Sequence, residues 1–345
     1  MKNKMQAMLL GFLLAGLVGC AGVAQTPAPA ATQNWGEIGN ETVSETPNVD
    51  PPAFVPSGTP PPRPENIPES ITIQGRQYGT NQRTVSIFGE NLTNEDIEPL
   101  RYMVNLTELS LTGNHHITDL SPIAGLTNLT HLSIYNSEIN DITPLAYLTN
   151  LVSLHLGIAM ISTHDLELDI ITYETIDIAP LANLTNLIYL DLFASTNNIT
   201  PISNLTNLQE LNLSTNQIID LTPLANLTNL QSLFLLGEQI TDLEPLSNLI
   251  NLKKLDLIWN RTIADISPLA NLIYLQDLTL RGNQITDIRP LAGLTNLNRL
   301  SLVINQISDI TPLAGLTNLT SLGLDDNPIT DWSPVSHIAN VHGRP

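Results

Sequence analysis

Cysteine is almost absent from this chain of 345 residues, in which Cys20 stands alone. A single cysteine excludes an intramolecular disulfide and any zinc site built from several cysteines. Aromatic residues are also scarce, at 4% of the chain. Lys and Arg number 13 against 33 Asp and Glu, which gives a formal net charge of −20. This balance argues against nucleic acid as a partner and against a protein that lies flat on an anionic membrane.

Patterns that indicate catalysis are missing as well. The sequence offers no Ser-His-Asp set, no phosphate-binding loop and no paired carboxylates in an expected cleft. His131 and His155 fall on neighbouring predicted strands, but roughly 8 Å apart, which is too wide for one metal without a third ligand. We therefore predict no catalytic residue, no cofactor and no metal centre, and an enzyme is the least favoured of three hypotheses.

The chain does contain a repeat of about 22 residues, Leu-x-x-Leu-x-Leu-x-x-Asn-x-Ile-x-Asp-Ile-x-Pro-Leu, with clean copies from Leu208, Leu275, Leu297 and Leu319. Leucines at the first, fourth and sixth positions form the leucine-rich-repeat signature. The Leu-x-Leu step has period two and predicts a short strand with both leucines pointing inward. Because one copy cannot bury a core alone, the copies must stack. We predict an α/β solenoid: a right-handed superhelix with a concave parallel sheet and short 3-10 or helical turns on its convex side.

Two polar features of the repeat have expected structural roles. The Asn at the ninth position, as in Asn283 and Asn305, can satisfy backbone groups of adjacent coils. On the convex side, pairs such as Thr311-Pro312 predict an N-cap residue followed by Pro at the first position of a turn. An Asp two residues earlier, such as Asp309, favours the positive end of that turn. A stripe that binds cations is the alternative interpretation of these aspartates.

Residues 1–19 form a predicted signal peptide, with Lys2 and Lys4 before an apolar run that ends at Leu17-Val18-Gly19-Cys20. This ending is similar to a bacterial lipobox, in which the cysteine becomes the diacylated first residue. We expect lipidation at Cys20 and attachment to a membrane through that lipid, because the apolar run is too short to span a bilayer comfortably. An ordinary signal peptide with an incidental cysteine is the alternative.

The remainder divides into three predicted segments. Residues 20–70 hold the acylated cysteine and a proline-rich linker that cannot bury a core. Residues 71–105 form an N-terminal cap and a degenerate first repeat, with strands near Ile71 and Val85 and a helical segment from Thr93 to Met103.

Residues 106–345 contain the repeats and a C-terminal cap. Four apolar side chains are expected to cover the last coil: Trp332, Val335, Ile338 and Val341. An insertion at about 158–174 lengthens one copy, and we expect a loop or an added strand there. Calcium bound by its carboxylates is the alternative.

The Leu-Thr-Asn-Leu junctions and the Ile-Thr-Asp-Ile-x-Pro-Leu-Ala stretches give the chain a further likeness. From Val85 to Val341 it resembles bacterial internalin-type leucine-rich-repeat proteins. The resemblance implies a surface binding protein without catalysis, and some members of that family are host-cell adhesins. Their ligand contacts lie at variable positions of the repeat, so the resemblance assigns no ligand-binding residue here.

Candidate ligand-binding residues come instead from the third, fifth, seventh and eighth positions of the repeats, which face the concave side or its margin. Most of the few aromatic residues fall there and, with two aliphatic residues, predict one apolar patch: Tyr135, Tyr189, Phe193, Phe234, Leu236, Ile258 and Trp259. Its expected polar rim is Asp191, Glu210, Lys254 and Asp256. Such patches are frequent contact sites. Local packing between neighbouring strands is the alternative.

These features together favour an exported, lipid-anchored, non-catalytic recognition module or adhesin at the cell surface or cell envelope. We expect a monomer that presents its concave face to a protein or glycan ligand. The alternative is a scaffold or spacer of the cell envelope without a specific ligand.

Overall fold

The computed structural model describes residues 59–89, 91–158, 162–165, 170–173, 175–214, 218–236 and 239–344. All of them belong to one compact unit of the chain. The predicted signal peptide, Cys20 and most of the proline-rich linker lie outside the described residues.

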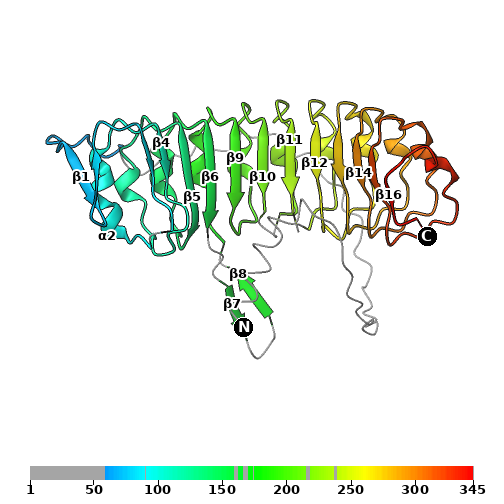
Figure 1. The fold of residues 1–345 in the computed structure, drawn as a ribbon, viewed down its shortest axis with the longest axis horizontal. Helices are drawn as coiled ribbons and strands as arrows, with labels where there is room; N and C mark the ends of the chain where they lie inside the picture. The colour runs from blue at the N-terminus through cyan, green and yellow to red at the C-terminus, as the bar shows by residue number, and fades with distance from the viewer. Residues whose placement is uncertain are drawn as a thin grey trace, which may run out of the picture. The chain divides into compact units, whose positions relative to one another are not determined.

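A twelve-stranded sheet runs through the repeats, with the strands in chain order from β3 to β16 apart from the inserted pair (Figure 1). Its strands are β3 Thr84–Ser86, β4 Glu108–Ser110, β5 His131–Ser137, β6 Ser153–Ile158, β9 Tyr189–Phe193, β10 Glu210–Leu213, β11 Ser232–Leu235, β12 Lys254–Asp256, β13 Asp277–Thr279, β14 Arg299–Ser301, β15 Ser321–Gly323 and β16 Val341–His342. Every pairing between them is parallel. The leucine-rich-repeat solenoid predicted from the sequence is confirmed.

The register of this sheet places equivalent leucines side by side. Leu211 pairs with Leu190 on one side and Leu233 on the other, and all three are fully buried. The first, fourth and sixth leucines and the later aliphatic residues of each copy merge into one continuous core. Each coil therefore buries its apolar side chains against both neighbours, which a single copy cannot do.

Ninth-position asparagines connect successive coils beside the strand ends. Asn305 donates through Nδ2 to the carbonyl oxygens of Leu280 and Leu302, both at 3.0 Å. Its Oδ1 accepts the N–H of Ile285 at 3.1 Å. Asn327 repeats the pattern one coil later. The predicted role of this Asn is confirmed: its amide serves backbone groups that the strands leave unpaired.

Short 3-10 turns form the opposite side of the coils. They are η3 Ser121–Ile123, η4 Thr143–Tyr147, η5 Ala179–Asn183, η6 Thr200–Ile202, η7 Thr222–Leu224, η8 Glu244–Leu246, η9 Ser267–Asn271, η10 Arg289–Leu291, η11 Thr311–Gly315 and η12 Ser333–Val335. The predicted Ser or Thr N-cap is wrong by one position. Thr311 is the first residue of η11, Pro312 is the second, and the N-cap Ile310 has no side chain that could accept a hydrogen bond.

The aspartate two residues earlier supplies the missing acceptor. Asp309 Oδ1 accepts the N–H of Thr311 at 2.9 Å, and Asp331 does the same for Ser333. An Asp side chain reaches the N–H two residues ahead in such a turn. The hydrogen bond from the Ser333 N–H lowers the pKa of the Asp331 carboxyl. The aspartates at this position of the repeat therefore accept the first N–H of each 3-10 turn that follows them.

The N-terminal cap begins with an antiparallel hairpin of β1 Ser70–Ile73 and β2 Arg76–Gly79. Helix α2 Asn94–Ile97 follows β3, with Thr93 as its N-cap in a reciprocal capping box with Asp96. The 3-10 helix η2 Glu98–Tyr102 continues it.

At the other end, Val335 and Ile338 are buried, and Trp332 and Val341 pack against the core. Strand β16 pairs with β15 at the last edge of the long sheet. The four residues expected to cover the last coil therefore contact it.

The insertion contains β7 Ser162–Asp165 and β8 Ile170–Tyr173, which pair antiparallel as a separate two-stranded sheet. An added strand was one of the expected forms of this segment, and the structure has two. Residues 159–161, 166–169 and 174 lie outside the described residues, so the alternative of bound calcium concerns side chains that the structure does not describe.

Candidate partner-binding face

The regular register of the long sheet arranges the outward side chains in rows. The third-position row contains Ser153, Tyr189, Glu210, Ser232 and Lys254, each beside the next. The fifth-position row passes through Asp191, and the seventh-position row through Phe193. Neighbouring strands lie about 4.8 Å apart, so side chains in one row are in reach of each other.

Five of these side chains come together on β5, β6 and β9. We name them the Asp191 cluster: Tyr135, His155, Tyr189, Asp191 and Phe193. The ring of Tyr135 lies against Gly157 on the neighbouring strand, where a Cβ would overlap it. Because Gly157 leaves this space, Tyr135 reaches across β6 and donates a hydrogen bond from its hydroxyl to Asp191 Oδ2 at 3.3 Å.

His155 contributes both a ring and a nitrogen to this cluster. Its ring centroid lies 4.5 Å from that of Tyr189, with the planes inclined by 32°. Its Nδ1 lies 3.6 Å from Asp191 Oδ2. Burial, with the nearby Asp191 carboxylate, raises the pKa of the Tyr135 hydroxyl well above its usual value and that of Tyr189 in the same direction. Both hydroxyls therefore stay protonated at physiological pH.

Four other predicted residues lie on β11 and β12 or just after them. We name them the Trp259 group: Phe234, Leu236, Ile258 and Trp259. Leu236 is exposed, and the other three are partly buried. Trp259 has a φ of +58°, a left-handed conformation that is uncommon outside glycine, and its ring lies against Gly282 of the next coil.

Two arginines flank the Trp259 ring. The guanidinium carbons of Arg281 and Arg261 lie 5.6 Å and 6.0 Å from the ring centroid. These distances allow a cation–π attraction. This end of the face therefore combines an aromatic ring with positive charge.

The single apolar patch expected from the sequence is in fact two groups. Strand β10 separates them, and it presents Glu210 and Asn212 between Tyr189 and Phe234. Asp191, expected at the polar rim, lies inside the first group. The repeat pattern places these residues on the outward side of the strands, but it does not show that polar β10 divides the apolar surface.

Asp256 is the last residue of β12 and the fifth position of its repeat, and it lies beside Phe234 of β11 and Thr279 of β13. Its Oδ1 accepts the N–H of Ile258 at 3.1 Å. Burial raises the pKa of this carboxyl to about 6, and the Ile258 hydrogen bond opposes that rise only in part. At neutral pH the folded protein holds an ionised, poorly solvated carboxylate here.

This carboxylate gives a pH-dependent prediction. The unfolded chain releases the Asp256 proton near pH 4 and the folded chain near pH 6, so the free energy of unfolding falls as pH rises through that window. We expect Asp256→Asn to be more stable than the parent by about 2 kcal/mol above pH 6 and equal to it below pH 4. Urea unfolding of both proteins from pH 4 to 8 measures this. A difference that does not change with pH would contradict the prediction.

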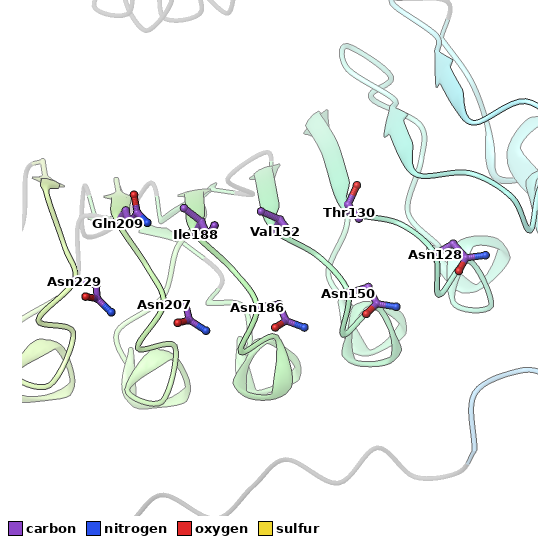
Figure 2. A pocket seen from close by; sticks show the side chains of 9 residues that line it. All are labelled: Asn128, Thr130, Asn150, Val152, Asn186, Ile188, Asn207, Gln209 and Asn229. Carbon is purple, nitrogen blue, oxygen red and sulfur yellow. The ribbon is translucent and has the colours of Figure 1, made fainter.

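A groove of about 640 Å³ runs along the flank of the sheet, beside the beginnings of its strands (Figure 2). Asparagines from successive coils form one wall, and Thr130, Val152, Ile188 and Gln209 form the other. Asn150 and Asn207 donate to carbonyl oxygens of the preceding coil, Thr127 O at 2.8 Å and Thr185 O at 2.9 Å. Because these amides already join neighbouring coils, the packing of the repeat accounts for the groove.

Three residues that contact the two groups were not among the predicted site residues. They are His155 and Arg281, which occupy outward positions of their repeats, and Arg261, which lies beyond the strand. For His155 the register alone was a usable signal, because it pairs directly with Asp191. Arg261 gave no such signal, because it lies beyond the end of β12 and both Trp259 and Arg261 have a positive φ.

Comparison with known proteins agrees with the fold. The family described as "Leucine Rich repeats (2 copies)" matches residues 206–248, 274–315 and 295–337. An internalin from Listeria monocytogenes, known from its crystal structure, shares 32% sequence identity with this chain. The two structures superpose with a TM-score of 0.65, and the match covers 79% of this chain and 90% of the internalin. This chain belongs to the internalin family.

More distant structures share the fold. The functional domain of InlJ from Listeria monocytogenes is 23% identical with a TM-score of 0.58, over 77% of this chain and 56% of that one. A leucine-rich-repeat protein of Leptospira interrogans is 22% identical with a TM-score of 0.53, over 71% and 74%. No curated protein matches the chain significantly.

Two features are absent from the described part of this internalin-family chain. None of its helices has the length and apolar character needed to cross a membrane. No three His, Asp or Glu side chains within it gather closely enough to hold a metal ion.

Proposed function

We propose that this internalin-family protein is an exported, lipid-anchored binding protein that recognises a protein partner with the concave face of its solenoid. One observation carries the proposal. In a chain with 4% aromatic residues, five aromatic side chains lie on the strands of this face or at its margin. Aromatic residues dominate the binding energy of many protein interfaces.

The exposure of these residues supports recognition more than packing alone. Leu236 is 40% exposed, and the rings of Tyr189, Phe234 and Trp259 are only partly buried. A partner could bury the remaining surface. The Asp191 cluster and the Trp259 group would then act as two contact regions on either side of β10.

We expect Phe234→Ala and Trp259→Ala each to weaken binding of the partner by about tenfold, because each removes a large apolar contact. The fold should persist, since both side chains lie outside the leucine core. Pull-down with the full-length protein, followed by titration of the captured partner, measures the loss. Ile219→Ala is the control, because it removes an exposed aliphatic side chain away from the strands. Unchanged affinity in both aromatic variants would refute this surface.

The lipid anchor is tested separately. We expect Cys20→Ser to abolish incorporation of labelled fatty acid and to move the protein from the detergent phase to the aqueous phase, because acylation requires the cysteine sulfur. The parent protein, with its single cysteine, is the reference. Partition of the variant into the detergent phase would contradict a lipid at this position.

The second candidate is a scaffold or spacer of the cell envelope. The same experiments distinguish it from a binding protein. Deletion of the protein would disturb the envelope, the pull-down would capture no saturable partner, and the aromatic variants would behave like the parent.

A further inference from the structure

The basic residues of this chain are unevenly distributed. Between Arg101 and Lys253 the sequence contains no lysine or arginine. Strands β4, β5, β6, β9, β10 and β11 all lie within this stretch. Carboxylates on this part of the concave face therefore have no lysine or arginine from their own repeats to pair with.

Asp191 is the carboxylate most affected by this shortage. Only 13% of its side chain is exposed. The Tyr135 hydroxyl and His155 Nδ1 both approach the same oxygen, Oδ2. The other oxygen, Oδ1, is buried and has no hydrogen-bond partner among the described residues. A buried acceptor without a donor is costly, so this atom is incompletely satisfied in the free protein.

The surroundings of Asp191 define the kind of donor that would fit. Tyr135, Tyr189 and Phe193 are partly buried, and each retains some accessible surface on the concave side. Aromatic faces attract cations, and a guanidinium stacks on them while it presents several N–H donors in one plane. A lysine ammonium is more strongly hydrated and lacks the planar shape.

We propose that the Asp191 cluster is a subsite for an arginine side chain of the protein partner, with the guanidinium pairing with the Asp191 carboxylate, whose side chain is 13% exposed, and resting on the surrounding rings. This rests on the proposed function, in which the concave face binds a protein. The negative charge of this half of the face favours such a group at a distance, and the rings with the Asp191 carboxylate select it at contact.

The test uses small probes and the full-length protein. N-acetyl-arginine methylamide, its lysine counterpart and its neutral citrulline counterpart are titrated at physiological salt, and binding is followed by line broadening of the probe NMR signals. Physiological salt screens long-range attraction to the acidic chain. We expect the arginine probe to bind more tightly than the other two.

Matched variants locate the subsite. Asp191→Asn should weaken binding of the arginine probe by about tenfold, because a hydrogen bond to a charged group is lost. Asp220→Asn removes the same charge from an exposed turn and should leave binding unchanged. That control should fold, since Asn198 already makes the equivalent hydrogen bond to the N–H of Thr200.

Tyr135→Phe provides a second test with the opposite sign. It removes the hydroxyl that donates to Asp191, which leaves the carboxylate freer to accept from the probe, so the arginine affinity should rise about threefold. Equal binding of the three probes, equal losses in Asp191→Asn and Asp220→Asn, or weaker binding in Tyr135→Phe would each overturn the subsite. If the subsite fails while Phe234→Ala and Trp259→Ala still weaken the partner, the proposed function stands without it.

Discussion

Replacing Asn305 by alanine is expected to lower the free energy of unfolding by about 4 kcal/mol, because one side chain serves several backbone groups inside the solenoid. Its Oδ1 accepts the N–H of Ile285, and its Nδ2 donates to the carbonyl oxygens of Leu280 and Leu302. The two carbonyls keep another donor from Asn283 or Asn327. The Ile285 N–H has no other acceptor among the described residues once Asn305 Oδ1 is removed, so it becomes a buried donor without a partner.

The matched control for this variant is Asn318→Ala, at the end of the same copy of the repeat. Asn318 is exposed and makes one hydrogen bond, from Nδ2 to the carbonyl oxygen of Thr295 at 2.8 Å. Its loss should cost about 1 kcal/mol. Urea denaturation of both variants measures the difference. Equal effects would show that the buried ladder contributes no more than a surface hydrogen bond.

Replacing Gly282 by alanine should be nearly as damaging, with a loss of about 3 kcal/mol. Gly282 has a φ of +74°, and an alanine in this left-handed region costs about 1–2 kcal/mol. The new Cβ would also overlap the ring of Trp259. The ring must then leave its position, which removes packing and its approach to Arg281.

A shift in tryptophan emission should accompany the loss of stability in Gly282→Ala, because the ring of Trp259 gains solvent. Gly293→Ala is the control: its Cβ would meet nothing within 4 Å, and its φ is not positive. It should be neutral or slightly stabilising. An unchanged emission spectrum in Gly282→Ala would show that Trp259 does not depend on this glycine.

Much of the fold could be predicted because the same pattern of leucines recurs in every copy of the repeat. The period of the leucines gave the strands, the parallel sheet and the continuous core. Thr93 and the following acidic residues predicted the start of a helix, and the capping box with Asp96 is present. The positions of the turns were predicted, but Ser or Thr was expected to cap them. In the structure, Asp309 and its equivalents accept the first N–H of the turn instead. Both residue types suit that role, and only backbone geometry distinguishes them.

The candidate site was less predictable because its contacts cross strands. The sequence placed Tyr135, Tyr189 and Phe193 on the concave side, but not the reach of Tyr135 over Gly157 to Asp191. That contact joins residues 56 positions apart in the sequence. Neither the division of the apolar surface by β10 nor the arginines around Trp259 followed from the pattern of the repeat.

By itself, the sequence determined that the chain forms a solenoid and which side chains point away from its core, because period-two leucines allow only one face of each strand to be buried. The tertiary structure alone decided which of those outward side chains meet. It brought Asp191 under Tyr135 and His155 and left one carboxylate oxygen unpaired. The physical reason is that the period of a repeat fixes direction, whereas contact depends on side-chain length, neighbouring glycines and local backbone angles across adjacent coils.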